Sequence, residues 1–196
     1  MSSAQGERRV AIIPWFPLGL RIGVISDTHL ATPGVTLGAE IASVFAGVDL
    51  IIHTGDVYQT FVLDELEWIA PVLCARGNGD TDPAFDADPR VAVTHLVEAE
   101  GRRVGAVHAL VYPETHWRSL EASMEFRFGG RVDAIVFGDS HSALVERHNG
   151  VLLVNPGSPT LPDQLIGVPG SVAILDVCPD RVDARLVWLT TAFREL

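Results

Sequence analysis

Apolar and polar residues are arranged along the first 80 positions in a pattern typical of strands and helices in turn. Short, uninterrupted apolar runs at residues 22–25, 50–52 and 72–75 suit strands that are buried on both faces of a layered sheet. Between these runs, apolar residues recur at helical spacing over residues 37–45 and 62–70. This part of the chain therefore predicts a βαβαβ unit.

The rest of the chain has the pattern of hairpins. The paired apolar runs are 91–97 with 104–108, 143–147 with 151–154, and 172–177 with 182–189. Asn149-Gly150 joins the second pair, and Asn-Gly between apolar runs is a strong hairpin signal. A helix is predicted over 114–128 and a further strand over 132–137. Parallel units combined with hairpins predict an α/β fold of two packed sheets flanked by helices.

Residues 1–19 precede the first predicted core strand. Two arginines are followed by an apolar segment over residues 10–20, which is too short to span a bilayer and is interrupted by two prolines. We expect residues 1–19 to be an extension packed on the domain or on a partner subunit, with membrane attachment or export as the alternative. Residues 20–196 then form a single domain, and the apolar pair Trp15-Phe16 suggests a homo-oligomer.

The composition excludes several classes of protein. The 14 basic residues are all arginine, and without a lysine the chain has neither a Schiff-base nucleophile nor a Walker A phosphate loop. The 25 acidic residues give a formal charge of -11, which argues against an extended nucleic-acid surface. The two cysteines cannot form a four-thiolate metal site or a disulfide scaffold, which favours a cytoplasmic protein.

Polar side chains follow five of the predicted strands, directly after each strand ends. Because the carboxyl ends of strands in open α/β sheets border the ligand crevice, these side chains are expected to converge. They are carboxylates, imidazoles and one amide, a set that suits Mn, Fe or Zn and is about right for two ions. The candidate ligands are Asp27, His29, Asp56, Asn78, His108, Asp139 and His141.

The order and spacing of these residues resemble the calcineurin-like metallophosphoesterases, from about residue 20 to the C-terminus. The matching motifs are Asp27-x-His29, Gly55-Asp56, Gly77-Asn78-x-Asp80, the isolated His108, and Gly138-x-Ser140-His141. Asn155-Pro156-Gly157-Ser158 is typical of the small single-domain phosphodiesterase branch, which includes a retromer subunit. The resemblance implies a four-layer α-β-β-α sandwich of two mixed β-sheets.

The resemblance also implies a role for each candidate. Asp27, His29 and His141 would bind one divalent metal ion, and Asn78 and His108 the other, with Asp56 bridging the two. Manganese is the first expectation for both ions, with Fe, Ni, Co, Zn and Mg as alternatives. A hydroxide bridging the ions would attack phosphorus in line with the leaving oxygen, so that Asp56, Asn78 and His108 act at the reacting group. The implied substrate is a phosphoester, and a diester in preference to a monoester.

Two positions depart from the family pattern. Asp139 stands where the motif has a histidine that normally binds the second metal, so the second site either gains a carboxylate ligand or is weakened or empty. Gly79 stands where many members have a histidine taken to protonate the leaving group. We therefore expect activated esters to be cleaved faster than alkyl esters.

Each candidate also has a purely structural explanation. Asp27 and Asp56 could cap helices or turns, Asn78 could be a left-handed turn residue, and His108 could be a core histidine. Asp80 is expected to orient its loop rather than to bind metal, and His53 has no motif and is expected to be structural.

Two further residues are candidate substrate contacts, and the function has an alternative. Arg76 would hold phosphate or else form a strand-end salt bridge, and His116 would reach the cleft or else face a helix or solvent. The alternative to an enzyme is a catalytically weak scaffold of the same fold that binds other proteins.

Overall fold

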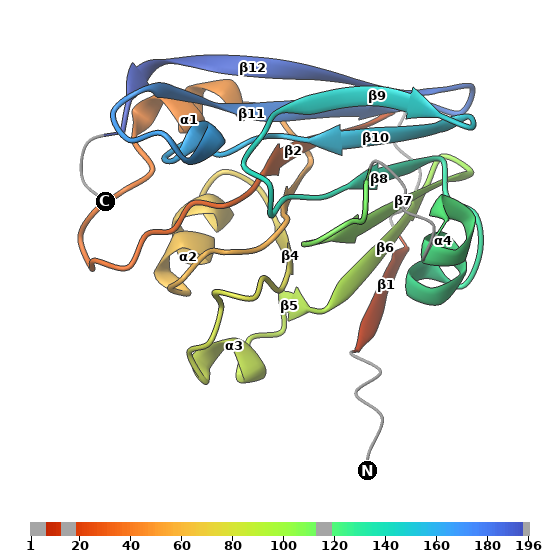
Figure 1. The fold of residues 1–196 in the computed structure, drawn as a ribbon, viewed down its shortest axis with the longest axis horizontal. Coiled ribbons are helices and arrows are strands. Elements are labelled where there is room, and N and C mark those ends of the chain that lie inside the picture. Colours follow the sequence, from red (N-terminus) through yellow and green to blue (C-terminus); the bar gives the residue numbers. More distant parts are fainter. Residues whose placement is uncertain (1–6, 13–18, 113–118, 194–196) are drawn as a thin grey trace.

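The computed structural model describes residues 7–12, 19–112 and 119–193. The βαβαβ unit and the last hairpin contribute five strands to a six-stranded mixed sheet, and β5 is the sixth (Figure 1). The strand order of this sheet is β12-β11-β2-β3-β4-β5. Strands β2 to β5 run parallel, while β11 pairs antiparallel with β2 and β12. The bounds of these strands are β2 (Leu20–Ile25), β3 (Leu50–His53), β4 (Val72–Ala75), β5 (Val91–Ala92), β11 (Pro169–Val177) and β12 (Val182–Ala192).

The two middle hairpins, together with β1 and β8, build the second six-stranded sheet, in the order β1-β6-β7-β8-β10-β9. β6 pairs antiparallel with β7 and β9 with β10, as the hairpin signals predict, and β8 lies parallel between β7 and β10. The bounds of these strands are β1 (Arg8–Ile12), β6 (Thr94–Ala99), β7 (Arg102–Val107), β8 (Ala134–Val136), β9 (Leu144–His148) and β10 (Val151–Asn155).

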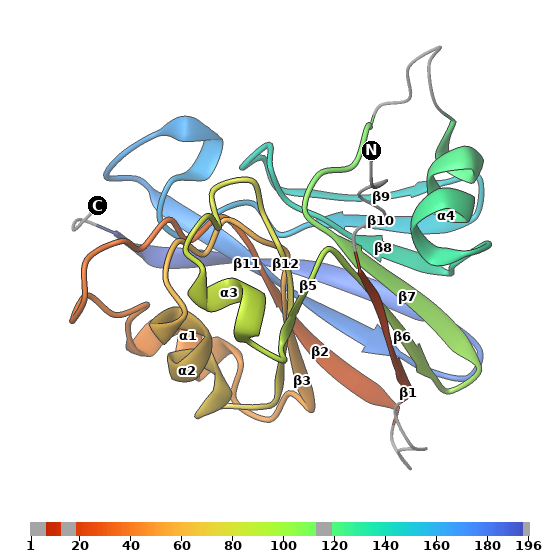
Figure 2. The same ribbon diagram turned by 90° about the horizontal axis from the view of Figure 1, so that it is seen from below.

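The two sheets pack face to face, and helices cover their outer faces (Figures 1 and 2). Side chains such as Val24 and Ile52 of the first sheet meet Ala106 and Val136 of the second in one buried cluster. The first sheet is covered by α1 (Ala39–Val44) and α2 (Phe61–Glu67), which bury Ile41 and Leu63. The second sheet is covered by α4 (Leu120–Phe128), and α3 (Ala84–Ala87) follows β4 in the chain. The predicted four-layer α-β-β-α sandwich of two mixed sheets is therefore confirmed.

The predicted strand over residues 91–97 is wrong, because this segment is divided between the two sheets. β5 pairs with β4 in the first sheet, whereas β6 pairs with β7 in the second, and Val93 links them. The segment is mostly apolar because both of its halves are buried, and only Val93 between them is exposed. An apolar run shows that a strand is buried but not which sheet it joins.

The predicted helix over residues 114–128 is confirmed over α4, but Ser119 is not helical. Ser119 has extended backbone angles, and its hydroxyl accepts a hydrogen bond from the N–H of Ala122 at 3.2 Å, so α4 begins at Leu120. Gly129 ends the helix with a left-handed φ of 69°. Residues 113–118 lie outside the described residues. Within the described part of the chain, no helix is long and apolar enough to cross a membrane.

Part of the N-terminal segment adds a strand to the second sheet. β1 pairs parallel with β6, with Arg8 opposite Thr94 and Ile12 opposite Glu98. This strand lies at the edge of the sheet, next to β6 in both views (Figures 1 and 2). The Trp15-Phe16 pair, on which the predicted homo-oligomer depends, lies outside the described residues.

Candidate metal centre

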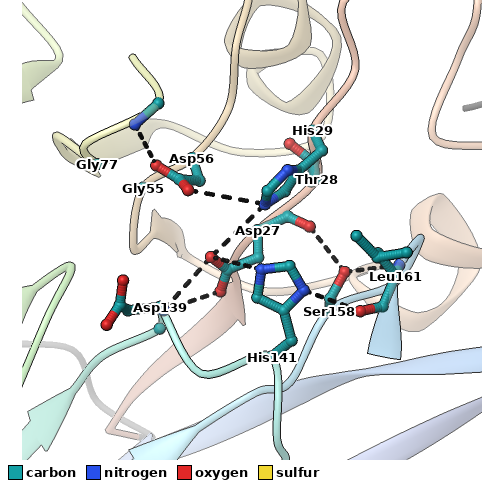
Figure 3. Close-up of polar contacts among 12 residues, drawn as sticks. Asp27, Thr28, His29, Gly55, Asp56, Gly77, Asp139, His141, Ser158 and Leu161 are labelled. Carbon is teal, nitrogen blue, oxygen red and sulfur yellow. Dashed lines mark hydrogen bonds and ion pairs between the residues drawn. The ribbon is translucent and has the colours of Figure 1, made fainter. Parts of the chain in front are cut away.

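The loops after β2 and β8 bring Asp27, His29 and His141 together. The Nε2 atoms of His141 and His29 lie 3.6 Å and 3.9 Å from Oδ1 of Asp27. Asp27 is fully buried, and Figure 3 shows both imidazoles directed at its carboxylate. One ligand atom from each of the three residues lies within 4.8 Å of the other two. This spacing suits a single cation bound by all three.

A second group forms around His108, at the end of β7. Its Nε2 lies 3.2 Å from Oδ1 of Asn78, 3.4 Å from Oδ1 of Asp56 and 3.5 Å from Oδ1 of Asp139. His108 and Asp56 are buried, whereas the Asp139 side chain is 53% exposed. The carboxylate at 139 therefore lies within reach of a cation that His108 and Asn78 could hold.

Two carboxylates connect the groups. Asp56 Oδ2 lies 3.7 Å from Nε2 of His29, while its Oδ1 lies 3.4 Å from Nε2 of His108. Asp27 belongs to both sets of potential ligand atoms, the first with His29 and His141 and the second with Asp56 and His108. The resemblance assigned a bridging position to Asp56 alone. The side chains of all seven sequence candidates thus form one connected cluster.

Backbone carbonyls orient two of the imidazoles for cation binding. Nδ1 of His108 lies 2.7 Å from the carbonyl oxygen of Thr54, and Nδ1 of His141 lies 2.9 Å from that of Leu161. A carbonyl only accepts, so each Nδ1 donates in these bonds and each Nε2 is directed at the carboxylates as the atom that could bind a cation. His29 Nε2 is a buried nitrogen without a hydrogen-bond partner among the described residues. A cation bound by the three Nε2 atoms and the carboxylates would offset the clustered negative charge.

Backbone strain is concentrated in this cluster. Five of its members have left-handed φ angles: Asp27 at 53°, His29 at 53°, Asp56 at 54°, Asp139 at 69° and His141 at 59°. Such angles cost roughly 1–3 kcal/mol each in non-glycine residues and persist where surrounding contacts impose them, commonly at functional sites. Asp27 and Asp56 do not cap the helices that follow them, because the N-cap residues of α1 and α2 are Gly38 and Thr60. The φ angle of Asn78 is not positive, so the alternative that Asn78 is a left-handed turn residue is wrong.

Asp80 holds two of these loops in place through its buried carboxylate. Its oxygens accept hydrogen bonds from the backbone N–H groups of Asp56 at 3.1 Å, Val57 at 2.7 Å, Tyr58 at 2.9 Å and Gly77 at 2.7 Å. These bonds tie the loop after β3 to the loop after β4. The prediction that Asp80 orients its loop is therefore confirmed.

The segment Asn155–Ser158 locks the loops after β2 and β8 together, a role that the sequence reading left unassigned. The Asn155 amide donates to the carbonyl oxygen of Gly138 at 3.0 Å. The Ser158 hydroxyl donates to the carbonyl oxygen of Asp27 at 2.7 Å (Figure 3). Just beyond this segment, the Thr160 hydroxyl donates to the carbonyl oxygen of Thr28 at 2.8 Å. The Asn-Pro-Gly-Ser motif was the sequence feature that pointed to this segment, but only the folded chain shows which loops the motif contacts.

Arg76, one of the further predicted substrate contacts, forms a salt bridge outside the cluster. Its guanidinium pairs with Asp86 and donates to the carbonyl oxygen of Asp80 at 2.9 Å, which is the salt-bridge alternative. His116 lies outside the described residues. Phosphate binding by Arg76 and a substrate contact by His116 stay predictions.

His53 lies under the cluster as a structural histidine, and burial lowers its pKa to about 4. Its Nδ1 accepts from the N–H of Gly55 at 3.1 Å, so Nε2 carries the proton and donates to the Thr28 hydroxyl at 3.2 Å. The unfolded chain binds a proton below its ordinary pKa of about 6.5, whereas the folded chain does not. Stability is therefore lost as the pH falls from about 6.5 to about 4.

From this shift we expect His53 to reduce the free energy of unfolding by about 2 kcal/mol at pH 5 relative to pH 7.5. Urea unfolding of the wild type and of His53→Gln at both pH values would measure it. The variant should show a smaller pH dependence, and His148→Gln on β9 should keep the wild-type dependence. Equal pH dependence in His53→Gln and the wild type would contradict the assignment.

Two mixed sheets with Asp and His side chains gathered at strand ends define an α/β protein with a metal-binding centre. Residues 20–180 match the calcineurin-like phosphoesterase superfamily domain. The chain therefore belongs to the calcineurin-like phosphoesterase superfamily, as its motifs predict.

Relatives support this placement over most of the chain. A probable metallophosphoesterase of Methanothermobacter thermautotrophicus is 34% identical over 166 residues, covering 85% of this chain and 91% of the relative. A phosphodiesterase of Methanocaldococcus jannaschii is 26% identical over 164 residues, covering 80% and 93%. The crystal structure of Chaetomium thermophilum Vps29 has a similar fold, with a TM-score of 0.66 at 17% identity, covering 90% of this chain and 100% of Vps29.

Proposed function

We propose that this protein is a metal-dependent phosphodiesterase that uses two divalent cations. The observation that carries the proposal is the connected cluster, in which Asp56 lies within 3.7 Å of His29 and 3.4 Å of His108. One relative is named a phosphodiesterase, which supports diesters as the preferred substrates over monoesters. Two cations in such a cluster would polarise a phosphoryl oxygen and lower the pKa of a water molecule.

In this proposal the chain's own residues hold the cations and fix their positions. Asp27, His29 and His141 would bind the first, and Asn78, His108 and Asp139 the second, with Asp56 between them. The carbonyl oxygens of Thr54 and Leu161 keep the His108 and His141 rings oriented. Asp80 ties the loops after β3 and β4 together, and Ser158 and Asn155 bind the loops after β2 and β8. The centre is therefore organised before substrate binds.

Hydrolysis of a chromogenic diester, with the matching monoester as comparison, tests this function. We expect hydrolysis with Mn²⁺, abolished by a chelator and restored by added metal, with a higher kcat/KM for the diester. The same assay with Ni²⁺, Co²⁺, Mg²⁺ and Zn²⁺ identifies the preferred metal. No activity with any of them, together with less than one bound metal per chain, would favour the scaffold alternative.

We further propose that Asp139 is a ligand of the second cation. Its carboxylate lies 3.5 Å from Nε2 of His108, where the family pattern has a histidine. A carboxylate in place of an imidazole makes the site harder and favours Mn²⁺ or Mg²⁺ over softer ions. We also propose manganese as the bound metal. We propose a cytoplasmic location as well, which the two free cysteines favour.

If so, Asp139→Ala should lower the metal content from two Mn²⁺ per chain to one. Metal analysis after equilibrium dialysis measures the content, and Asp180→Ala, an exposed carboxylate in the β11–β12 turn, is the control. Asp139→His should restore the second ion and raise the affinity for Zn²⁺ relative to Mn²⁺. Unchanged metal content in Asp139→Ala would show that the carboxylate is not a ligand.

A further inference from the structure

Tyr58 lies against the candidate metal centre without belonging to it. Its ring centroid is 4.5 Å from that of His29, with the two planes tilted by 49°. The residue is partly exposed and is absent from the three hydrophobic clusters of the described residues. Tyr58 therefore offers aromatic surface at the edge of a polar centre, where the packing of the core does not require it.

Surrounding contacts impose this position on Tyr58. Its φ of 78° is left-handed, which is uncommon for an aromatic residue, and Asp80 binds its backbone N–H at 2.9 Å. Gly79 lies against the ring, since a Cβ at residue 79 would be 2.4 Å from Cε1 of Tyr58 and 3.0 Å from Oδ1 of Asp56. The ring thus takes the volume beside Asp56 that a side chain at residue 79 would need.

On the basis of the proposed function, we propose that Tyr58 determines specificity by stacking on a flat aromatic ester group of the phosphodiester. The chain has no lysine, and the nearby Arg76 guanidinium is bound to Asp86 and to the Asp80 carbonyl. The cations would then hold the phosphoryl group, and the ester group is recognised by uncharged surface. An aryl ester and a nucleoside ester both present the planar ring that stacks on a phenol.

Two phosphonates that cannot be hydrolysed test this role in the full-length, Mn²⁺-loaded protein. Phenylphosphonate and methylphosphonate share the anion and differ in the ring, and calorimetry or competition with a diester gives their affinities. We expect phenylphosphonate to bind roughly tenfold more tightly to the wild type. Tyr58→Phe should keep this ratio because it keeps the ring, whereas Tyr58→Leu should bring the ratio toward one.

The control is Trp68→Ala, since this side chain is 92% exposed at the end of α2. Trp68 precedes β4, whereas the candidate ligand Asn78 follows that strand. Trp68→Ala should keep the wild-type ratio. Equal binding of the two phosphonates by the wild type, or an unchanged ratio in Tyr58→Leu, would overturn this inference alone. A ratio lost in Tyr58→Phe would assign the effect to the hydroxyl and overturn stacking. If neither phosphonate bound the metal-loaded protein, the inference and the proposed function would both be overturned.

Discussion

Replacing Asp56 with asparagine is expected to lower kcat/KM for a chromogenic diester about a thousandfold, equivalent to about 4 kcal/mol of transition-state stabilisation. The carboxylate lies within 3.7 Å of His29 and 3.4 Å of His108, so its charge acts on both halves of the cluster. Asparagine keeps the shape but removes the negative charge that two cations would share. Steady-state kinetics with saturating Mn²⁺ would measure the loss.

The same variant should also bind fewer than two Mn²⁺ ions per chain, which metal analysis would show independently of activity. Its fold should be retained, since Oδ1 of residue 56 can still accept from the N–H of Gly79, a bond of 2.7 Å in the wild type. Asp180→Asn, in the exposed β11–β12 turn, is the matched control and should behave as the wild type. Full activity in Asp56→Asn would contradict the assignment of Asp56 as a metal ligand.

Replacing Gly77 with alanine is expected to lower the free energy of unfolding by about 3 kcal/mol and to reduce diesterase activity at least about a hundredfold. A Cβ at this position would lie 2.2 Å from both the backbone nitrogen and Oδ1 of Asp56. The backbone nitrogen cannot move aside, because Asp80 holds it at 3.1 Å. The loops after β3 and β4 would have to separate, and that would displace Asp56.

Urea unfolding and diester kinetics on the same preparation would measure both effects. Gly101→Ala is the control, because Gly101 has a left-handed φ of 72° with no neighbouring atom within 4 Å of an added Cβ. It should cost only about 1 kcal/mol of strain and leave the activity unchanged. Wild-type stability and activity in Gly77→Ala would contradict the close approach of the two loops.

The candidate ligands could be predicted because their chemistry is local in the sequence. Asp27 and His29, and likewise Asp139 and His141, stand next to apolar runs that become strands, and strand ends converge in this kind of sheet. Their left-handed φ angles could not be predicted, since contacts from distant loops impose them. The dual reach of Asp27 is also visible only in the folded chain, where ligand atoms from both groups lie within 4.8 Å of its carboxylate.

Where the predictions of secondary structure were wrong, the deciding contact was also distant or specific. The division of residues 91–97 between β5 and β6 depends on which strand each half pairs with, and burial alone carries no such information. The start of α4 depends on the Ser119 cap, which is one hydrogen bond rather than a period of apolar residues.

The sequence by itself determined the alternation of strands and helices, the two-sheet class and the chemical types in the centre. These follow from apolar periodicity and from residue identity, which act over a few neighbouring positions. Only the tertiary structure decided that Asp80 joins two loops, that Arg76 pairs with Asp86, and that Tyr58 lies over Gly79. Each of these contacts depends on the path of the backbone between distant segments, and folding alone sets that path.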